Sequence, residues 1–508
     1  MFFGPNSFEG QCPSNAGARL IQGRTVHATL GLSPASSLQV QNLQLHGKTK
    51  TKVERIAGPA AATVIDECSQ LSATLFHADA LLHTYARAVR HDLQIEQYTD
   101  ADQLFGKMPV LILSGDFLQL LPVPESGSFL APVDQASWEH RQGRTIFQKI
   151  KYVFEFKTSN RFKDPLLKEI LEVMRTKTGC KLSAQAWKAL QETHVKSPDS
   201  LAETGSWFET SYDWITVAMA QHYRTRLEAA ERKQALFLIV AVDAPDCECP
   251  KEIHRAIQKV PSMSTTKKLM NLLPIFTGSR VRLTKTVMAP ELVAEREGCV
   301  VGIELHPTDQ RRFSQTKVFQ QGAFLPTFLP RAIYVKFDDF DLDLIAPIPC
   351  QTHHIIGPDK ACCNCQWFSG IVAVTPVTAA WKFNQKLAKG LPHVKLNIER
   401  MQFPLAPALP KTIHTLQGTT CDPGLICHLA LPKTLSPESK WLAYFVMLSR
   451  VRSWQSLRCI GEIDKSILEG GPPKRMQDVI DQLFEQRIMD TIKACATARE
   501  FLGWPPHA

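Results

Sequence analysis

The sequence lacks the long apolar run of a membrane-spanning helix and the secretory signal of an exported protein. It also lacks internal repeats. Its longest apolar run, residues 235–242, is far shorter than the roughly 20 residues a membrane-spanning helix needs. Residues 1–17 contain no basic stretch followed by an apolar core, so no signal peptide is visible. The 14 cysteines are scattered and do not form the framework of a small secreted domain. We therefore expect a reduced protein of the nucleus or another intracellular compartment, with no membrane partner.

The sequence also lacks a strong charge of either sign. Lys and Arg number 58 against 49 Asp and Glu, which gives a formal net charge of +9. A mild basic excess suits a polyanionic partner, although charge bears on association and says little about the fold. The 508 residues are enough for two to four domains, each with its own core.

Apolar runs that end in small or acidic residues indicate strands of an α/β domain. Residues 63–65 and 110–113 are predicted to be buried parallel strands, and 152–156 a third strand. Between the first two, residues 72–90 have helical spacing. In such sheets the ligand-binding and catalytic residues usually lie at the carboxyl ends of the strands. Asp66, Glu67 and Asp116 come directly after predicted strands, at these ends.

Further along the chain the pattern predicts more helices and a β-rich insertion. Residues 165–175 read as a helix that starts with Pro165 after an Asp164 N-cap, and 206–240 is expected to be mostly helical. Residues 279–284 alternate apolar and basic side chains, which predicts a strand with one basic face; Arg280, Arg282 and Lys285 could follow a phosphate backbone or simply face solvent. The tail 477–501 is predicted to be an amphipathic helix.

The first constellation with chemical meaning is the carboxylate pair Asp66 and Glu67 at the end of a strand. The first carboxylate could hold Mg²⁺ through water, and the second could polarise an attacking water. The alternative is a solvated loop or a helix N-cap without catalytic duty. A second constellation is the segment 115–123, in which Gln119 could sense a terminal phosphate, or which could be only a Gly-Asp turn.

Arg450 ends the apolar segment 445–449. A buried guanidinium is costly unless it meets an anion, and a triphosphate is such a partner. The alternative is an internal salt bridge. Residues 412–420 supply a further polar segment with His414, Thr415, Gln417 and Gly418.

Taken in order, these segments resemble the motifs of the Pif1-like, RecD-related DNA helicases of superfamily one. The resemblance rests on TVHATLGL at 25–32, IDECS at 65–69, GDFLQLLPV at 115–123, NRF at 160–162 followed by Asp164, QFPL at 402–405, TIHTLQGTT at 412–420 and LSRVR at 448–452. Leu121 stands where the family pattern has a proline. The motifs cover most of the chain between residues 14 and 463.

The resemblance implies two RecA-like lobes of the P-loop NTPase type around an ATP and Mg²⁺ site. It implies that Asp66 holds Mg²⁺ through water, that Glu67 activates water and that Gln119 senses the γ-phosphate. Arg161 and Arg450 would be arginine fingers, and Asp116, Gln417 and Gly418 would lie at the nucleotide. For DNA the resemblance singles out four residues: Thr25, His27, His414 and Thr415.

By the same resemblance, the protein would unwind duplex DNA while moving 5′ to 3′ along a single strand, in DNA repair, recombination and telomere maintenance. The division expected from these segments places the first lobe at 1–158, the second lobe at 159–288 and 411–465, an SH3-like β insertion at 289–410 and a helical tail at 466–508.

A phosphate-binding P-loop, G-x-x-x-x-G-K-[ST], is missing from the sequence. Gly47-Lys48-Thr49 has the correct final tripeptide, but Asn42 occupies the first glycine position. We expect the first lobe to lack its P-loop strand and helix, as in a truncated chain, and this chain to bind ATP poorly. The rival hypotheses are an inactive helicase fragment that still binds single-stranded DNA, and a metal-dependent nuclease that uses Asp66, Glu67 and Asp116.

A cysteine- and histidine-rich segment offers a possible zinc site, apart from any helicase chemistry. Cys350, His353, Cys362 and Cys365 have spacings compatible with tetrahedral zinc. The alternative is a cysteine-rich loop with free thiols, which the scattered intracellular cysteines favour.

Overall fold

The computed structural model of the chain divides into two compact units. Unit 1 contains Met1–Val195 and Ile413–Ala508, and unit 2 contains Lys196–Thr412. The structure describes residues 7–31, 47–94, 104–134, 136–156, 159, 161–177, 179–196, 201, 204–260, 263, 265–289, 291–315, 322–340, 371–386 and 393–502. The predicted zinc ligands Cys350, His353, Cys362 and Cys365 lie outside these residues. In the described part of the chain, no helix is long and apolar enough to span a bilayer.

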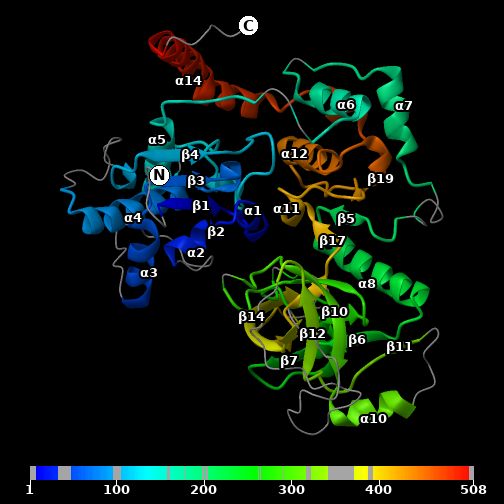
Figure 1. Cartoon of the computed structure of the whole chain (residues 1–508). Helices are drawn as coiled ribbons and strands as arrows, with labels where there is room; N and C mark the ends of the chain where they lie inside the picture. Colours follow the sequence, from blue (N-terminus) through cyan, green and yellow to red (C-terminus); the bar gives the residue numbers. More distant parts are fainter. Residues whose placement is uncertain are drawn as a thin grey trace, which may run out of the picture. The chain divides into compact units, whose positions relative to one another are not determined.

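Unit 1 is built around a parallel sheet with the strand order β2-β1-β3-β4 (Figure 1). Its strands are β1 Phe8–Cys12, β2 Arg24–Thr25, β3 Ala62–Ile65 and β4 Val110–Leu113. A second, parallel pair joins β18 Leu425–His428 to β19 Leu457–Ile460. The mixed α/β class and the strands at 63–65 and 110–113 are confirmed.

The helices of unit 1 begin where the sequence provides caps. Ser72 accepts a hydrogen bond from the Leu75 N–H at the start of α4, and Asp164 accepts one from the Leu167 N–H ahead of Pro165 in α6. The helices are α1 Asn15–Leu20, α2 Val26–Leu30, α3 Gly47–Ala57, α4 Ala73–His91, α5 Trp138–Gln148, α6 Pro165–Arg175, α7 Ala184–Glu192, α11 Ile413–Leu416, α12 Pro437–Leu448, α13 Lys465–Glu469 and α14 Lys474–Phe501. The predicted helices at 72–90, 165–175 and 477–501 are therefore confirmed.

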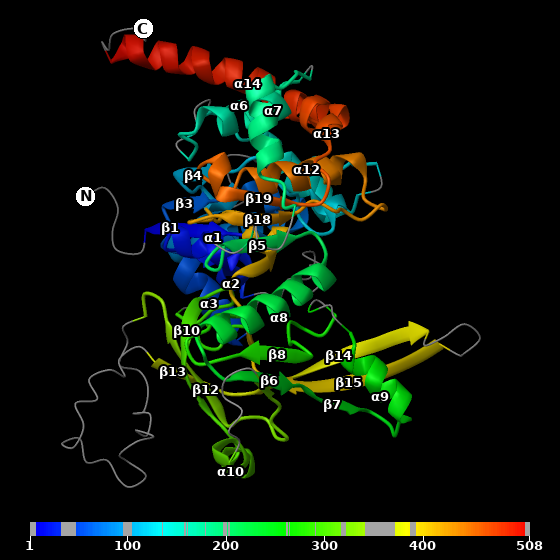
Figure 2. The same cartoon turned by 90° about the vertical axis from the view of Figure 1, so that its right-hand side faces the viewer.

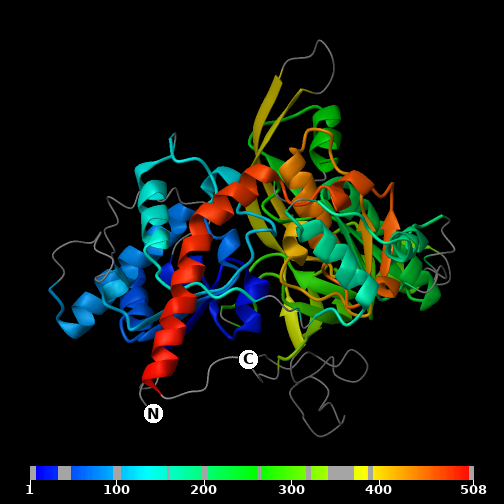
Figure 3. The same cartoon turned by 90° about the horizontal axis from the view of Figure 1, so that it is seen from above.

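An aromatic cluster forms part of the core beside the sheet and includes a ring of the long helix α14, the red helix of Figure 3. Phe129 stacks on Phe147 with ring centroids 4.3 Å apart, and Phe76 meets Phe129 edge-on at 5.6 Å. Phe117, just after β4, packs against Phe147 and against Phe484 of α14. These rings anchor the segment after β4, which carries Asp116 and Gln119.

Two predictions for unit 1 are wrong. Residues 152–156 do not form a strand; among the described residues they pair with no other strand. β4 is not buried, because it lies at the edge of the sheet and all four of its residues are at least partly exposed. The apolar composition identified these segments but did not show what would cover them.

Unit 2 is rich in β-structure and has its own core (Figure 2). Its main sheet has the order β13-β12-β10-β9-β16, with antiparallel neighbours. Smaller sheets have the orders β11-β6-β8 and β14-β15-β7, and β17 pairs with β5. The strands are β5 Phe208–Ser211, β6 Leu236–Val240, β7 Val242–Pro245, β8 Leu272–Ile275, β9 Arg280–Leu283, β10 Glu297–Glu304, β11 Ala323–Phe324, β12 Ala332–Phe337, β13 Ile371–Val374, β14 Val377–Lys386, β15 His393–Gln402, β16 Leu405–Pro407 and β17 Pro410–Thr412.

The helices of unit 2 are α8 Trp214–Glu231, α9 Lys251–Gln258 and α10 Pro307–Gln315. The prediction that 206–240 is mostly helical is thus wrong at both ends, where β5 and β6 form. β9 lies before the predicted start of the β insertion at residue 289 but belongs to the same sheet as β10. The domain boundaries drawn from the sequence otherwise stay predictions.

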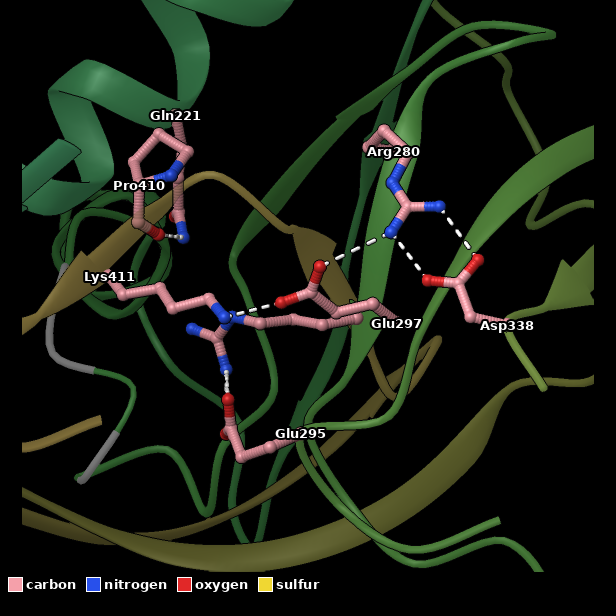
Figure 4. A network of polar contacts seen from close by, with 8 residues as sticks. Gln221, Arg280, Glu295, Glu297, Asp338, Pro410 and Lys411 are labelled. Carbon is pink, nitrogen blue, oxygen red and sulfur yellow. Dashed lines mark hydrogen bonds and ion pairs between the residues drawn. The ribbon is translucent and has the colours of Figure 1, made fainter. Parts of the chain in front are cut away.

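Six charged side chains of unit 2 form what we call the neutral network: Arg280, Arg282, Lys411, Glu295, Glu297 and Asp338 (Figure 4). Arg282 donates to both carboxylate oxygens of Glu295, at 2.7 and 2.8 Å, and Lys411 donates to Glu297. The Asp338 carboxylate raises the pKa of Arg280 above its ordinary value. Because Arg282 is 2% exposed, it fits neither alternative left open for the basic face of β9, contact with a phosphate backbone or exposure to solvent. Three cations meet three anions, so the network compensates its own charge.

Candidate nucleotide site

The predicted carboxylates lie at the carboxyl end of the sheet of unit 1, as the α/β pattern predicts. Asp66 follows β3, and its side chain accepts a hydrogen bond from the Ser114 hydroxyl, which follows β4. Backbone bonds fix this corner, since the Cys68 N–H donates to the Ser114 carbonyl at 2.8 Å. A Cβ on Gly115 would lie 2.9 Å from the Cys68 nitrogen and sulfur, so only glycine permits this close approach. Ser114 therefore belongs to the site, although the sequence argument did not assign it a role.

Glu67 sits in the left-handed backbone region, with φ +52°, at the sharp turn after β3. Its Oε2 accepts hydrogen bonds from the Gln70 amide at 3.5 Å and from the Gln417 amide at 3.4 Å. Gln417 is 2% exposed, and a Cβ on Gly418, with φ +80°, would lie 3.5 Å from Oε1 of Glu67. Burial raises the pKa of Glu67, and the neighbouring Asp66 carboxylate adds to that rise. The fold thus brings Gln417 and Gly418 to the predicted base across 350 positions of sequence.

Arg450 is the most deeply buried member of the cluster, at 1% exposure. It donates to the Val446 carbonyl at 3.1 Å, to the Ser449 hydroxyl at 2.8 Å and to Oε1 of Gln119 at 3.4 Å. Its Nη1 is buried and has no hydrogen-bond partner in the part of the chain that the structure describes. Burial lowers the pKa of Arg450 to about 10, and the nearby Arg161 cation contributes to that shift. A buried guanidinium with an unused donor and a cationic neighbour is suited to an anion.

Arg161 comes to the same place from the segment before α6. Its Nη1 donates to the Ser449 carbonyl at 2.9 Å, so both predicted arginine fingers contact Ser449. Burial lowers the pKa of Arg161, while Glu67 partly opposes that change. Hydrogen bonds link Arg161 and Arg450 through Ser449, and Arg450 to Gln119. The charge of Glu67, next to Asp66, acts on both arginines, so these residues lie near one another in unit 1.

Asp116 has a partner from a distant part of the sequence, Arg175, that was not predicted. Its Oδ1 accepts from the Leu118 N–H at 3.0 Å and from Arg175 of α6 at 2.8 Å, and its Oδ2 accepts from the Gln119 amide at 3.3 Å. The Arg175 guanidinium also lies 5.1 Å from the ring centroid of Phe445. Asp116 therefore holds Gln119 in place, and no local sequence signal announced Arg175, because a basic residue in the last turn of a helix is common.

The residues predicted to contact DNA lie in three elements of unit 1. Thr25 caps α2, where its hydroxyl accepts from the Ala28 N–H at 3.1 Å. His27 is half-buried in α2, and burial lowers its pKa. His414 and Thr415 belong to α11, with His414 exposed and Thr415 half-buried. Their contact with DNA stays a prediction.

The donor set fits part of a nucleotide site. Asp66 and the Ser114 hydroxyl offer oxygens of the kind Mg²⁺ prefers, and the unpaired Nη1 of Arg450 fits a phosphate oxygen. A lysine-bearing phosphate loop is not among the residues of this cluster. Gly47 opens α3, which packs against α2 and α4, and Thr49 lies against Gly31. In the described part of the chain no strand leads into that tripeptide, and the residues just before it are not described.

Comparison with known proteins bears on the family and on the fold. The family model for PIF1-like helicases matches residues 14–167. The fold is similar to that of the Pif1 helicase from Bacteroides in complex with ADP-AlF3 and single-stranded DNA, with a TM-score of 0.58 at 15% identity over 96% of this chain and 89% of that one. It is also similar to the Pif1 helicase from Candida albicans, with a TM-score of 0.52 at 17% identity over 94% of this chain and 89% of that one. No curated protein matches the sequence.

Proposed function

We propose that this chain, PIF1-like in the sequence of residues 14–167 and in its fold, is the motor of an ATP-dependent DNA helicase that moves 5′ to 3′. The observation that carries the proposal is the cluster in which Glu67, Gln119, Arg161 and Arg450 are brought together. Phosphoryl transfer needs little covalent help from a protein and depends on such positioned charges. The structures of the similar Bacteroides protein hold ADP-AlF3 and single-stranded DNA, which is consistent with both expected ligands.

Each residue of the cluster would have a definite part. ATP with Mg²⁺ would supply the transferable phosphoryl group and its counter-charge. Asp66 would hold the metal through water, and Glu67, whose pKa is raised by burial, would accept a proton from the attacking water. Gln119, held by Asp116, would orient that water or sense the terminal phosphate. Arg161 and Arg450 would neutralise charge that develops on the phosphoryl oxygens.

We place DNA against the residues that the family resemblance singled out: Thr25, His27, His414 and Thr415. α11 joins His414 and Thr415 to the catalytic cluster, because Leu416 alone separates Thr415 from Gln417 and Gln417 contacts Glu67. A movement of α11 on DNA binding would therefore shift a partner of the proposed base. By the resemblance, the protein acts on single-stranded and duplex DNA in repair, recombination and telomere maintenance, and we expect it in the nucleus or another intracellular compartment.

A second candidate is an inactive helicase fragment that binds single-stranded DNA without ATP turnover. The observation that favours it is the missing lysine-bearing phosphate loop in the 508 residues. Both candidates predict DNA binding that weakens with salt, with a slope near −0.7 for each phosphate neutralised on a single strand. They differ in DNA-stimulated hydrolysis.

The test combines fluorescence anisotropy of a labelled oligothymidine, over a series of salt concentrations, with phosphate release in the presence and absence of that DNA. For the chain alone we expect salt-dependent binding with weak, DNA-stimulated phosphate release that Glu67→Gln abolishes. Binding without any Glu67-dependent release selects the fragment hypothesis. Metal-dependent cleavage of the oligonucleotide without ATP would select the nuclease and overturn the proposal.

A further inference from the structure

Two cysteines lie in the short connection between β7 and α9 of unit 2. Cys247 is exposed and Cys249 is half-buried. Their sulfur atoms lie 4.0 Å apart, and the Cys249 thiol donates a hydrogen bond to the Cys247 carbonyl at 3.2 Å. That hydrogen bond holds the second sulfur beside the first. We call these two side chains the Cys247–Cys249 dithiol.

The fold fixes the connection at both ends. The Asp246 N–H donates to the Asn397 carbonyl at 2.9 Å, and the Asp246 carboxylate accepts from the Asn397 amide at 2.7 Å. At the other end, Ile257 of α9 belongs to a small core that includes Trp381 and Phe383 of β14. Figure 2 shows α9 beside β7 and the hairpin of β14 and β15. Because so few residues lie between the two anchors, bringing the thiols together costs little chain entropy.

The spacing of the two sulfur atoms suits a disulfide. A disulfide needs its sulfur atoms about 2.05 Å apart, and an exposed side chain that changes its staggered rotamer moves its sulfur far enough to close the remaining gap. Two thiols are only half of a tetrahedral zinc site, and in the described part of the chain no third His, Cys, Asp or Glu joins them. For a disulfide, two thiols are the complete set.

Two other exposed thiols in unit 1 provide a comparison. Cys180 and Cys495 are both exposed, and in the described part of the chain neither has a second cysteine sulfur within contact distance. A single thiol reacts with a small disulfide only as far as a mixed disulfide, whereas a neighbouring thiol can displace the second half of the reagent.

The charges around the dithiol select among small disulfides. The carboxylates of Asp246 and Glu248 flank Cys247, and both residues are exposed. In the first turn of α9, Lys251 and Glu252 carry opposite charges, so the carboxylates beside the cysteines leave the connection negative. A negative surface attracts a cationic reagent and repels an anionic one, and salt weakens both effects.

The two thiols differ in a way that orders the reaction. Partial burial raises the pKa of Cys249, and the contact with Cys247 and the charge of Asp246 add to that rise. The more exposed Cys247 therefore meets the reagent first. Since a thiol with a raised pKa is a poor leaving group, a disulfide that includes Cys249 resists reduction once it has formed.

We propose that the Cys247–Cys249 dithiol is a modification site that small cationic disulfides oxidise to an internal disulfide. The Cys247 thiolate attacks one sulfur of the reagent, and the first small thiol leaves with the proton that Cys247 lost. The Cys249 thiolate then attacks the Cys247 sulfur of the mixed disulfide, and the second small thiol leaves with the proton of Cys249. Two cysteine thiols are oxidised, and one small disulfide is reduced to two thiols. This site does not depend on the proposed function.

The test exposes the full, reduced chain to cystamine, a cationic disulfide, in the presence of cysteamine held well below a millimolar. Acid then stops the exchange, N-ethylmaleimide labels the remaining thiols, and trypsin releases residues 234–251, which contain Cys247 and Cys249 and no other cysteine. Mass spectrometry should show this peptide unlabelled and two hydrogens lighter. It should be half oxidised at a cystamine concentration at least about tenfold below that which half converts Cys180 and Cys495 to mixed disulfides, because the second thiol acts at a millimolar effective concentration.

Variants separate the two steps. Cys249→Ser should stop the reaction at a mixed disulfide on Cys247, whereas the matched control Cys495→Ser should leave the oxidation of peptide 234–251 unchanged. At low salt, cystamine should react at least about threefold faster than the anionic dithiodipropionate, and Glu248→Gln should reduce this preference. Circular dichroism of each variant shows whether it is folded.

Two results would overturn the proposal. A peptide 234–251 that carries two mixed disulfides, or that is oxidised no more readily than Cys180 and Cys495, would show that the two thiols do not act together. Equal rates with cystamine and dithiodipropionate at low salt would contradict the preference for cations.

Discussion

The two units bury arginine in opposite ways. In unit 2, Arg400 is fully buried, and its Nε and Nη2 donate to the two carboxylate oxygens of Asp243 at 2.7 and 2.8 Å. In unit 1, Arg450 is as deeply buried, yet among the described residues it has no carboxylate in ion-pair distance, and burial lowers its pKa to about 10. The fold itself supplies the counter-charge of Arg400, whereas we expect an anionic ligand to supply that of Arg450. The lack of a carboxylate partner at Arg450 therefore points to the candidate site more specifically than the net charge of the chain does.

The largest expected effect comes from breaking the compensated pair. Asp243→Asn should lower the free energy of unfolding of the protein by about 3–5 kcal/mol, because it leaves Arg400 buried and without its charge partner. Chemical denaturation followed by far-ultraviolet circular dichroism measures the change. The exposed Asp246, just after β7, provides the control, and Asp246→Asn should change the free energy by less than about 0.5 kcal/mol. If the two variants lowered the free energy of unfolding equally, the buried pair of Asp243 and Arg400 would not be a special source of stability.

A second variant tests whether a buried cation that is paired with carboxylates stabilises unit 1 as Arg400 is expected to stabilise unit 2. His83 of unit 1 is fully buried between Glu9, at 2.9 Å, and Asp79, at 3.0 Å, and these carboxylates raise its pKa well above 6.5 against the opposing effect of burial. Its charged form therefore contributes stability below pH 6.5, and that contribution is lost as the pH rises through the raised pKa.

His83→Gln should cost about 3 kcal/mol in mild acid, since it leaves two buried carboxylates without their cation, and the deficit should shrink toward alkaline pH. Denaturation curves across pH measure this deficit. The exposed His91 on the same helix provides the control, and His91→Gln should show no such pH dependence. A deficit that grows with pH would mean that His83 is neutral in the folded protein.

At the uncompensated arginine, the expected effect on stability is small and the effect on ligand response is large. Arg450→Met should change the free energy of unfolding by no more than about 1 kcal/mol in either direction, because it removes a poorly compensated buried charge. Inorganic pyrophosphate should raise the melting temperature of the original protein and not that of the variant. Arg452→Met, at an exposed position, should respond to pyrophosphate like the original protein. If Arg450→Met instead lowered the free energy of unfolding strongly, Arg450 would have a structural role and not a ligand-binding one.

The smallest effect is expected at Glu67. Burial raises the pKa of this carboxyl, so the protonated form is favoured in the folded state, and the stability it contributes is lost as the pH rises above 4.5. Glu67→Gln should therefore be more stable than the original protein at neutral pH, and the gain should vanish in mild acid. Melting temperatures at the two pH values measure the gain. A gain that persists in acid would come from the altered contact with Gln417 instead of the charge.

Local signals in the sequence predicted the features that depend on few neighbouring residues. The N-cap Asp164 and Pro165 placed the start of α6 correctly, and the heptad spacing of 72–90 placed α4. The short apolar run before Asp66 placed β3. Caps, periodicity and strand-end carboxylates act within a few residues, so a single sequence contains them.

Features that depend on distant partners could not be predicted in the same way. The run 152–156 has strand composition, yet a strand forms only where a neighbouring edge pairs with it. The alternating pattern of β9 left open whether its basic side chains follow a phosphate backbone or face solvent, but Arg282 is buried against Glu295, and Arg280 pairs with Glu297. The segment 206–240 contains strong helix formers, but strand pairing takes both of its ends.

The sequence by itself determined the order of the chemical segments, the α/β class and the placement of Asp66 and Glu67 at a strand end, because these follow from local composition and spacing. Only the tertiary structure decided that Gln417 reaches Glu67 and, among the described residues, that Arg450 is buried without a carboxylate and that β4 is the last strand of its sheet. Each of these depends on contacts between residues far apart in the chain, and a single sequence does not encode such contacts in any local pattern.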